Sequence, residues 1–192
     1  MLKNLVCIMF LRPSGLYARL RGHDLFIWAF VLQFFRWQTT AITTVVALYQ
    51  ENSPMLLPVP FGIDPKSYRY FEIYAYGPYG MLIITLMATA IWWYGRGYAV
   101  TLHMTLKRTW TLIGLCFFGP WLPSLLIDSF LVKQGWGGPQ VIIPWHISIV
   151  AIETLLLIVG LKTVFGISFN ISVRLGVGGG ALFLFLAGAA IR

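Results

Sequence analysis

Long runs of apolar residues dominate the chain, and polar residues cluster in the short segments between them. A helix needs about 20 apolar residues to cross a bilayer, because each residue adds about 1.5 Å and the hydrocarbon core is about 30 Å thick. Five stretches meet this requirement: 25–48, 76–94, 109–127, 141–161 and 175–191. The period-two alternation of a membrane β-barrel is absent. The sequence therefore predicts an all-α polytopic transmembrane helical bundle with five spans.

Two segments flank the first span. Residues 1–24 form a basic leader in which the apolar run 2–11 is short and no small-residue cleavage site follows. We expect an interfacial helix there rather than a secretory signal. The segment 49–75 contains four prolines and then an aromatic run, so we expect an irregular loop followed by a short stretch on the membrane surface. The rest of the chain, 25–192, is expected to form one transmembrane domain without an internal repeat.

Composition supports the membrane interpretation. The chain has 192 residues, of which 58% are hydrophobic and 10% are charged. Ordinary globular domains have about 45–50% apolar and about 25% charged residues. A soluble enzyme and a disordered chain are therefore disfavoured. The two cysteines, Cys7 and Cys116, are far apart in sequence and expected at different depths, so they indicate neither a disulfide framework nor a metal site.

The charged residues predict the orientation of the bundle. Lys and Arg total 14 against 6 Asp and Glu, an excess that in a polytopic membrane protein reports topology rather than nucleic-acid binding. Nine cations fall on one side of the five predicted spans: Lys3, Arg12, Arg19, Arg21, Arg96, Lys107, Arg108, Lys162 and Arg174. The opposite side has four cations and four acids: Lys66, Arg69, Lys133, Arg192, Glu51, Asp64, Glu72 and Asp128. The positive-inside rule therefore predicts a cytoplasmic N-terminus and an outside C-terminus.

A polar stripe runs along the first predicted span. Arg36 lies near its middle, where an ionised arginine costs at least about 2.5–3.5 kcal/mol on insertion scales. Gln33, Arg36, Thr40 and Thr44 are spaced by three or four residues, which places them on one face of a helix. We expect this face to be turned toward protein or water rather than lipid.

Glu153 is the second charge deep inside a predicted span. Counted from the cytoplasmic ends of their spans, the depths of Arg36 and Glu153 differ by only about 4–5 Å. We therefore expect the two residues to pair across spans one and four. Such a pair has two interpretations, a structural contact that fixes helix order and a proton or ion relay, and the sequence leaves both open.

Small residues and prolines indicate how two other spans pack. The last span is rich in glycine, which allows close approach of helix backbones, so we expect tight packing within the chain or self-association. Its packing residues are Gly176, Gly178, Gly179, Gly180 and Gly188. In the third span, Pro120 and Pro123 predict a break or kink in the outer half.

Residues that would support catalysis or a cofactor are not visible in the sequence. HExxH, CxxC, GxSxG and P-loop patterns are absent, as is a cluster of carboxylates for a divalent metal. His23 and His103 are expected at the cytoplasmic boundary and His146 near the outer one, so they do not form a haem-ligand pair. We expect no catalytic residue, no metal site and no cofactor.

Two short motifs accompany the predicted topology, a Gly-Leu…Gly-x-Ser stretch at 160–168 and a Tyr-Gly-Pro triplet at 76–78, which here opens the second span. The topology itself has five predicted spans, a basic N-terminus expected in the cytoplasm, a long first outer loop and a last helix rich in small residues. In these features the chain resembles the Yip-type domain family of integral membrane proteins. The resemblance implies a non-enzymatic five-helix protein; eukaryotic members interact with Rab GTPases in vesicle trafficking. Their acidic N-terminal region is replaced here by the basic leader, so we expect a prokaryotic relative in the cytoplasmic (inner) membrane.

These observations favour a non-catalytic integral membrane protein that acts as a scaffold or accessory subunit. Its expected partners are the lipid bilayer and other membrane proteins or further copies of itself, with no nucleic acid. Two alternatives remain open at this stage. One is a small transporter or channel that uses the Arg36/Glu153 polar centre, and the other is a quinone-interacting membrane subunit of a redox complex.

Overall fold

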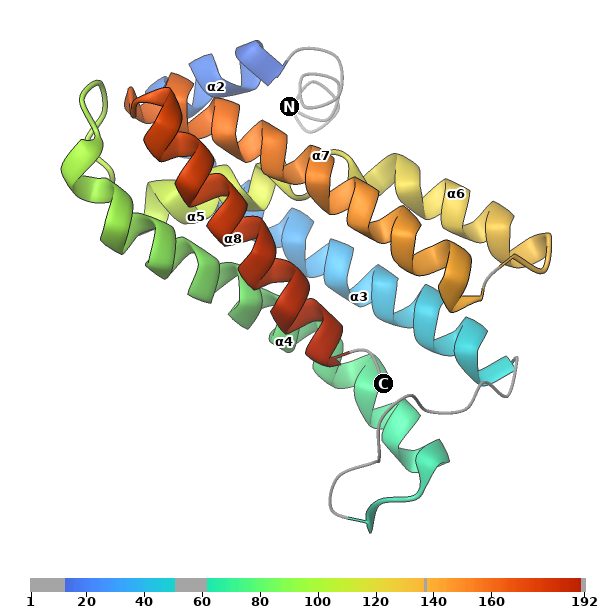
Figure 1. The fold of residues 1–192 in the computed structure, drawn as a ribbon. Coiled ribbons are helices and arrows are strands. Elements are labelled where there is room, and N and C mark those ends of the chain that lie inside the picture. Colours follow the sequence, from blue (N-terminus) through green and yellow to red (C-terminus); the bar gives the residue numbers. More distant parts are fainter. Residues whose placement is uncertain (1–12, 51–61, 137, 191–192) are drawn as a thin grey trace.

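The structure is a computed structural model that describes residues 13–50, 62–136 and 138–190, and all regular secondary structure in these ranges is helical. Figure 1 shows the helices as one bundle. Its elements are α2 (Pro13–Gly22), α3 (Phe26–Gln50), α4 (Pro65–Gly95), the short 3-10 helix η2 (Arg96–Tyr98), α5 (Leu106–Cys116), α6 (Trp121–Lys133), α7 (Pro139–Phe165) and α8 (Phe169–Ala190). The prediction of an all-helical chain is confirmed for these residues. The interfacial helix expected at 2–11 lies outside them.

Four helical segments are long and apolar enough to cross a membrane, namely Ile73–Tyr98, Leu106–Leu131, Gln140–Phe165 and Phe169–Gly188. They correspond to the second, third, fourth and fifth predicted spans. The first predicted span forms α3, which has 25 residues but is not among the four segments. Its middle carries polar side chains, which lower its mean hydropathy.

The second predicted span, 76–94, belongs to a longer helix than the hydropathy pattern predicted. The α4 helix has 31 residues and begins at Pro65, so the aromatic run expected as a separate surface stretch is its first turns. Asp64 caps this start, because its Oδ1 accepts hydrogen bonds from the backbone N–H groups of Lys66 at 3.0 Å and Ser67 at 3.1 Å. Hydrogen bonds from Ser67 lower the pKa of the Asp64 carboxyl. Pro78 lies inside the helix without ending it.

The third segment is interrupted, as its prolines predicted. Its first half, α5, ends at Cys116, and α6 starts at Trp121 directly after Pro120. All eight residues from Thr109 to Cys116 are buried. A helix surrounded in this way lies at the centre of its bundle. The prolines therefore divide this segment into a central half, α5, and a more peripheral half, α6.

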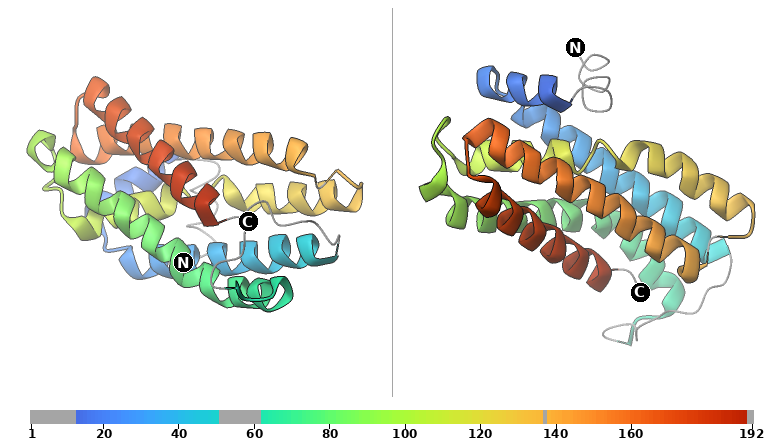
Figure 2. Two further views of the ribbon diagram at one scale, coloured as in Figure 1. Left: turned by 60° about the horizontal axis from the view of Figure 1, so that its bottom comes forward. Right: turned by 45° about the horizontal axis from the view of Figure 1, so that its top comes forward.

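Helices α3, α4 and α7 pack around α5. The α3 helix contacts α4, α5 and α6, while α7 contacts α8, α5 and α2, and α4 also contacts α8. Figure 2 shows α2 lying across the end of the bundle where α7 finishes. Tyr17 secures this position, because its buried hydroxyl donates a 2.7 Å hydrogen bond to the carbonyl of Leu156 on α7. The core is thus continuous from α2 at one end to the α3–α6 contact.

Candidate functional site

A buried ion pair joins α3 to α7. Arg36 Nη1 lies 2.8 Å from Glu153 Oε1, and Arg36 Nη2 donates a 3.2 Å hydrogen bond to Glu153 Oε2. Arg36 is 6% exposed and Glu153 is completely buried. The structure therefore brings together the two charged residues that the sequence placed inside spans. Two parallel contacts between a guanidinium and a carboxylate fix the relative orientation of both groups.

Aromatic rings enclose the arginine end of this ion pair. The Arg36 guanidinium carbon lies 5.3 Å from the ring centroid of Phe183 on α8 and 5.7 Å from that of Trp37. Phe183 also packs against Phe117, with ring centroids 4.9 Å apart. Aromatic faces attract cations and exclude water, so they strengthen a desolvated ion pair. Residues of α3, α7 and α8 thus meet around one charged centre.

The rest of the polar stripe on α3 contacts other helices. Gln33 is buried, and its Nε2 donates a 2.6 Å hydrogen bond to the carbonyl of Gly114 on α5. Thr40 Oγ1 accepts a 3.1 Å hydrogen bond from Trp121 Nε1 on α6 and donates one to the Arg36 carbonyl. Thr44 lies on the same helix, but its side chain is outside the described part. Three successive stripe residues therefore contact α5, α7 and α6 in turn.

Apart from Arg36 Nη1 and Glu153 Oε1, which face each other in the ion pair, two buried side-chain atoms have no hydrogen-bond partner among the described residues. They are Gln33 Oε1 and Trp37 Nε1. Buried polar groups are usually paired with protein or with water, so these two atoms mark a place where a water molecule or a ligand would be stabilised. The described residues of the polar stripe thus form hydrogen bonds to several helices, but the hydrogen-bonding capacity of Gln33 and of its neighbour Trp37 is not fully used.

The predicted packing glycines of α8 fall on two different faces. A Cβ added to Gly176 would lie 2.3 Å from Ile158 Cγ1, and one added to Gly180 would lie 2.2 Å from Thr154 Oγ1, so both glycines contact α7 closely. Gly179 approaches Ile91 of α4, where an added Cβ would lie 2.8 Å from Cδ1. The same test on Gly178 and Gly188 finds nothing within 4 Å. The GxxxG pair of this helix is therefore used inside the chain, while the other two glycines are open.

Two close contacts between α4 and α3, near the Arg36–Glu153 pair, were not predicted from the sequence. Gly80 lies against Trp37, and a Cβ at this position would be only 1.9 Å from the indole ring. A Cβ added to Gly77 would lie 2.8 Å from Gln38 Oε1. Both glycines lie on α4 and face α3. The three-residue spacing of Gly77 and Gly80 on one helix face was the available signal, but it does not say which helix the face contacts.

A second polar cluster joins the later part of α6 to the first turns of α7, at the opposite end of α7 from α2. Asp128 accepts a 2.8 Å hydrogen bond from Trp145 Nε1, and its other oxygen lies 3.1 Å from His146 Nε2. The sequence placed Asp128 and His146 on the same side without pairing them. Among the described residues, no group of three or more His, Cys, Asp or Glu side chains gathers where a metal ion could bind.

Comparisons with protein-family models, with curated proteins and with solved structures found no significant match to this chain. The Yip-type resemblance therefore stays a prediction that rests on the residues quoted for it.

Proposed function

We propose that this chain is a five-span integral membrane protein that acts as a non-catalytic scaffold or accessory subunit. The observation that carries the proposal is the division of the α3 stripe among three helices. Gln33, Arg36 and Thr40 contact α5, α7 and α6 respectively. Polar side chains that join helices hold a bundle in one arrangement. A rigid bundle of this kind is suited to presenting its outer surface to partners in the membrane.

The fifth span in this proposal is α3. Its 25 residues would extend about 37 Å at 1.5 Å per residue, which is enough to cross the hydrocarbon core. The charge of Arg36 is turned into the protein and paired, so it would not face lipid. Apolar residues on the opposite face are exposed, including Ile27, Val31 and Phe34. These exposures support a helix with one face toward lipid and one toward the bundle.

The distribution of charge supports a cytoplasmic position for the bundle end formed by α2, η2 and the start of α5. The described residues near this end include seven cations and one acid: Arg19, Arg21, Arg96, Lys107, Arg108, Lys162, Arg174 and Asp24. The described residues near the other end include three of each: Lys66, Arg69, Lys133, Asp64, Glu72 and Asp128. Under the positive-inside rule, the basic end is cytoplasmic. A prokaryotic cytoplasmic membrane and membership of the Yip-type family are part of the same proposal.

The open face of α8 is the surface we assign to a partner helix. Gly178 and Gly188 leave room for close approach, and the neighbouring side chains Val177 and Phe185 are 54% and 73% exposed. A second membrane protein, or another copy of this chain, would pack its own helix there. The inward glycines of the same helix are already in contact with α7 and α4.

The test is extraction of the full chain from its native membrane in mild detergent, followed by identification and quantification of the chains that copurify. We expect a companion membrane chain, or a second copy, in a fixed ratio that falls several-fold with Gly178→Leu. Ala151→Leu is the matched control, because Ala151 is an exposed small residue on a different helix, α7. A wild-type chain that leaves the membrane alone, or equal losses in both variants, would contradict the proposal.

A transporter or channel remains the second candidate, and the unsatisfied Gln33 Oε1 and Trp37 Nε1 favour it. Bound water at these atoms would place a hydrogen-bonded group beside the Arg36–Glu153 pair, as a proton path requires. Proton or ion flux in proteoliposomes separates the candidates. Flux that disappears with Glu153→Gln but persists with Asp128→Asn would replace the scaffold with a transporter.

A further inference from the structure

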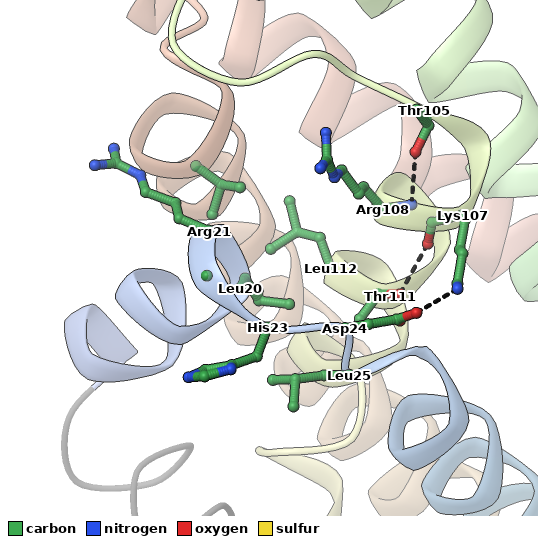
Figure 3. Close-up of a pocket in the computed structure, with 12 residues that line it drawn as sticks. Leu20, Arg21, His23, Asp24, Leu25, Thr105, Lys107, Arg108, Thr111 and Leu112 are labelled. Carbon is green, nitrogen blue, oxygen red and sulfur yellow. Dashed lines mark hydrogen bonds and ion pairs between the residues drawn. The ribbon is translucent and has the colours of Figure 1, made fainter.

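A cleft of about 390 Å³ opens at the basic end of the bundle (Figure 3). Its walls come from the end of α2, the connection from α2 to α3, and the first turns of α5. Four basic side chains line it, namely Arg21, His23, Lys107 and Arg108. These residues are far apart in sequence, and the packing of α2 on α7 brings the two groups to one opening.

The cations of the cleft keep unused donors. Arg21 donates to the carbonyl of Thr163, and Arg108 Nη1 donates to the carbonyl of His103 at 2.9 Å. A guanidinium has five N–H donors, so each arginine retains others for a ligand. Lys107 pairs with Asp24, the one acid among the described residues that line the cleft. The hydrogen bond from Lys107 lowers the pKa of Asp24, so this carboxylate is ionised at neutral pH and offsets one of the positive charges.

The floor of the cleft is apolar. It is formed by Leu20, Leu25, Leu112 and Val164, all of which are buried. A site for a small inorganic anion would not need such a floor. A basic rim over an apolar floor matches a molecule with a charged head joined to a hydrocarbon part.

The cleft lies at the level where membrane segments begin and end. Segment Leu106–Leu131 starts at its edge, and segment Gln140–Phe165 ends one residue after Val164. Lipid headgroups lie at the ends of membrane-spanning segments, where Lys and Arg side chains attract anionic lipids. The opening is therefore reachable from the headgroup layer of the bilayer.

We propose that this basic cleft binds the phosphate group of an anionic ligand, and that its apolar floor selects a phospholipid over a soluble phosphate compound. Arg21 and Arg108 donate to the phosphate oxygens, and Leu20, the most exposed of the apolar lining residues at 8%, contacts the glycerol. The proposal requires membrane insertion but no protein partner, so it stands or falls separately from the scaffold function.

The first experiment measures lipid retention by native mass spectrometry of the full chain in mild detergent. The probes are phosphatidylglycerol and phosphatidylcholine, added in equal amounts. We expect preferential retention of phosphatidylglycerol, reduced about fivefold for each cation removed in Arg21→Gln and Arg108→Gln. Arg21→Lys and Arg108→Lys should retain most of the binding. Arg174→Gln is the matched control, because Arg174 is an exposed cation of the same end that does not line the cleft.

A second pair of variants tests the cleft without altering charge. Gly22 lines the cleft, and an added Cβ there meets nothing within 4 Å, so Gly22→Trp would narrow the opening. Gly97 is equally open but lies outside the cleft, so Gly97→Trp is its control. We expect phosphatidylglycerol retention to fall with Gly22→Trp alone. Equal losses with Arg174→Gln and Arg21→Gln, or no loss with Gly22→Trp, would overturn the site.

A competition experiment decides whether the bound phosphate group belongs to a phospholipid or to a soluble compound. Inorganic phosphate and glycerol phosphate are added to the lipid-bound chain at matched ionic strength. If phosphatidylglycerol stays bound, the apolar floor contributes to binding and the ligand is a phospholipid. If either soluble compound displaces it at an equal concentration, the assignment to a lipid is overturned.

Discussion

Among the described residues, two pairs of an arginine or lysine with a carboxylate lie in opposite surroundings. The Arg36–Glu153 pair has side chains 7% and 0% exposed, while those of the Lys107–Asp24 pair are 55% and 64% exposed. Both pairs connect residues far apart in sequence. Water can replace the partner of an exposed charge, but it cannot do so for a buried one. The same type of contact is therefore expected to be essential at the centre and dispensable at the basic end.

The largest effect is expected when one charge of the central pair is removed. Arg36→Met or Glu153→Leu leaves the other charge buried and unpaired, which should cost about 3–5 kcal/mol of unfolding free energy. The double variant Arg36→Met/Glu153→Leu removes both charges, so its loss should be much smaller than the sum of the single losses. Reversible unfolding in detergent micelles measures all three. Additive losses would contradict the pairing.

The next largest effect is expected when a substitution displaces Trp37, an aromatic ring that packs beside Arg36 of the central pair. A Cβ on Gly80 would lie 1.9 Å from the ring of Trp37, which itself packs beside Arg36. Gly80→Ala should therefore cost about 1–3 kcal/mol, since overpacking forces backbone or ring movement. Unfolding and tryptophan fluorescence check this. Gly97→Ala is the control, because Gly97 has open space around it and should change neither signal.

A smaller difference is expected between the two faces of α8. Gly180→Ala places a methyl group 2.2 Å from Thr154 Oγ1, so this β-branched side chain must change its rotamer or shift, and we expect a loss of about 1 kcal/mol. Gly178→Ala meets nothing and gains helix propensity, so its stability should be unchanged or slightly raised. Unfolding of the two single variants under identical conditions measures the difference. Equal effects would mean that the inward and outward faces are assigned wrongly.

The smallest effect is expected at the exposed pair. Asp24→Asn should leave the unfolding free energy unchanged at neutral pH within measurement error. Because Lys107 lowers the folded-state pKa of Asp24, the pair stabilises the fold above the unfolded-state pKa, and this stabilisation is lost as the pH falls through the folded-state value. Acid titration of wild type and Asp24→Asn at low and high salt would show this small difference. A large neutral-pH loss in Asp24→Asn would contradict the comparison.

Much of the fold could be predicted from local pattern. The apolar runs predicted four helical segments, and the structure has helices there: α4, α5 with α6, α7 and α8. Pro120 and Pro123 predicted that the third span is interrupted, as it is between α5 and α6. Helix ends were less accurate, because capping by Asp64 extends α4 well before the apolar run begins. The aromatic run after the prolines is part of α4 for the same reason. These errors concern residues where hydrogen bonding, rather than hydropathy, decides where a helix starts.

The candidate site was predictable only in part. Equal depth along two spans was sufficient to predict that Arg36 and Glu153 could meet, and the structure has them 2.8 Å apart. The partners of Gln33 and Thr40 could not be predicted, because a stripe on one helix does not say which neighbour it faces. The separation of Gly178 from Gly180 and the contact of Gly80 with Trp37 were beyond the sequence for the same reason.

By itself, the sequence determined that this protein consists of long apolar helices with two charges inside them, because hydropathy and helical period are properties of consecutive residues. Only the tertiary structure decided what each polar group and each glycine contacts. Those contacts depend on how helices rotate and cross, which is set by packing among residues far apart in the chain. The basic cleft has the same origin, since it exists only where α2 packs on α7 beside the start of α5.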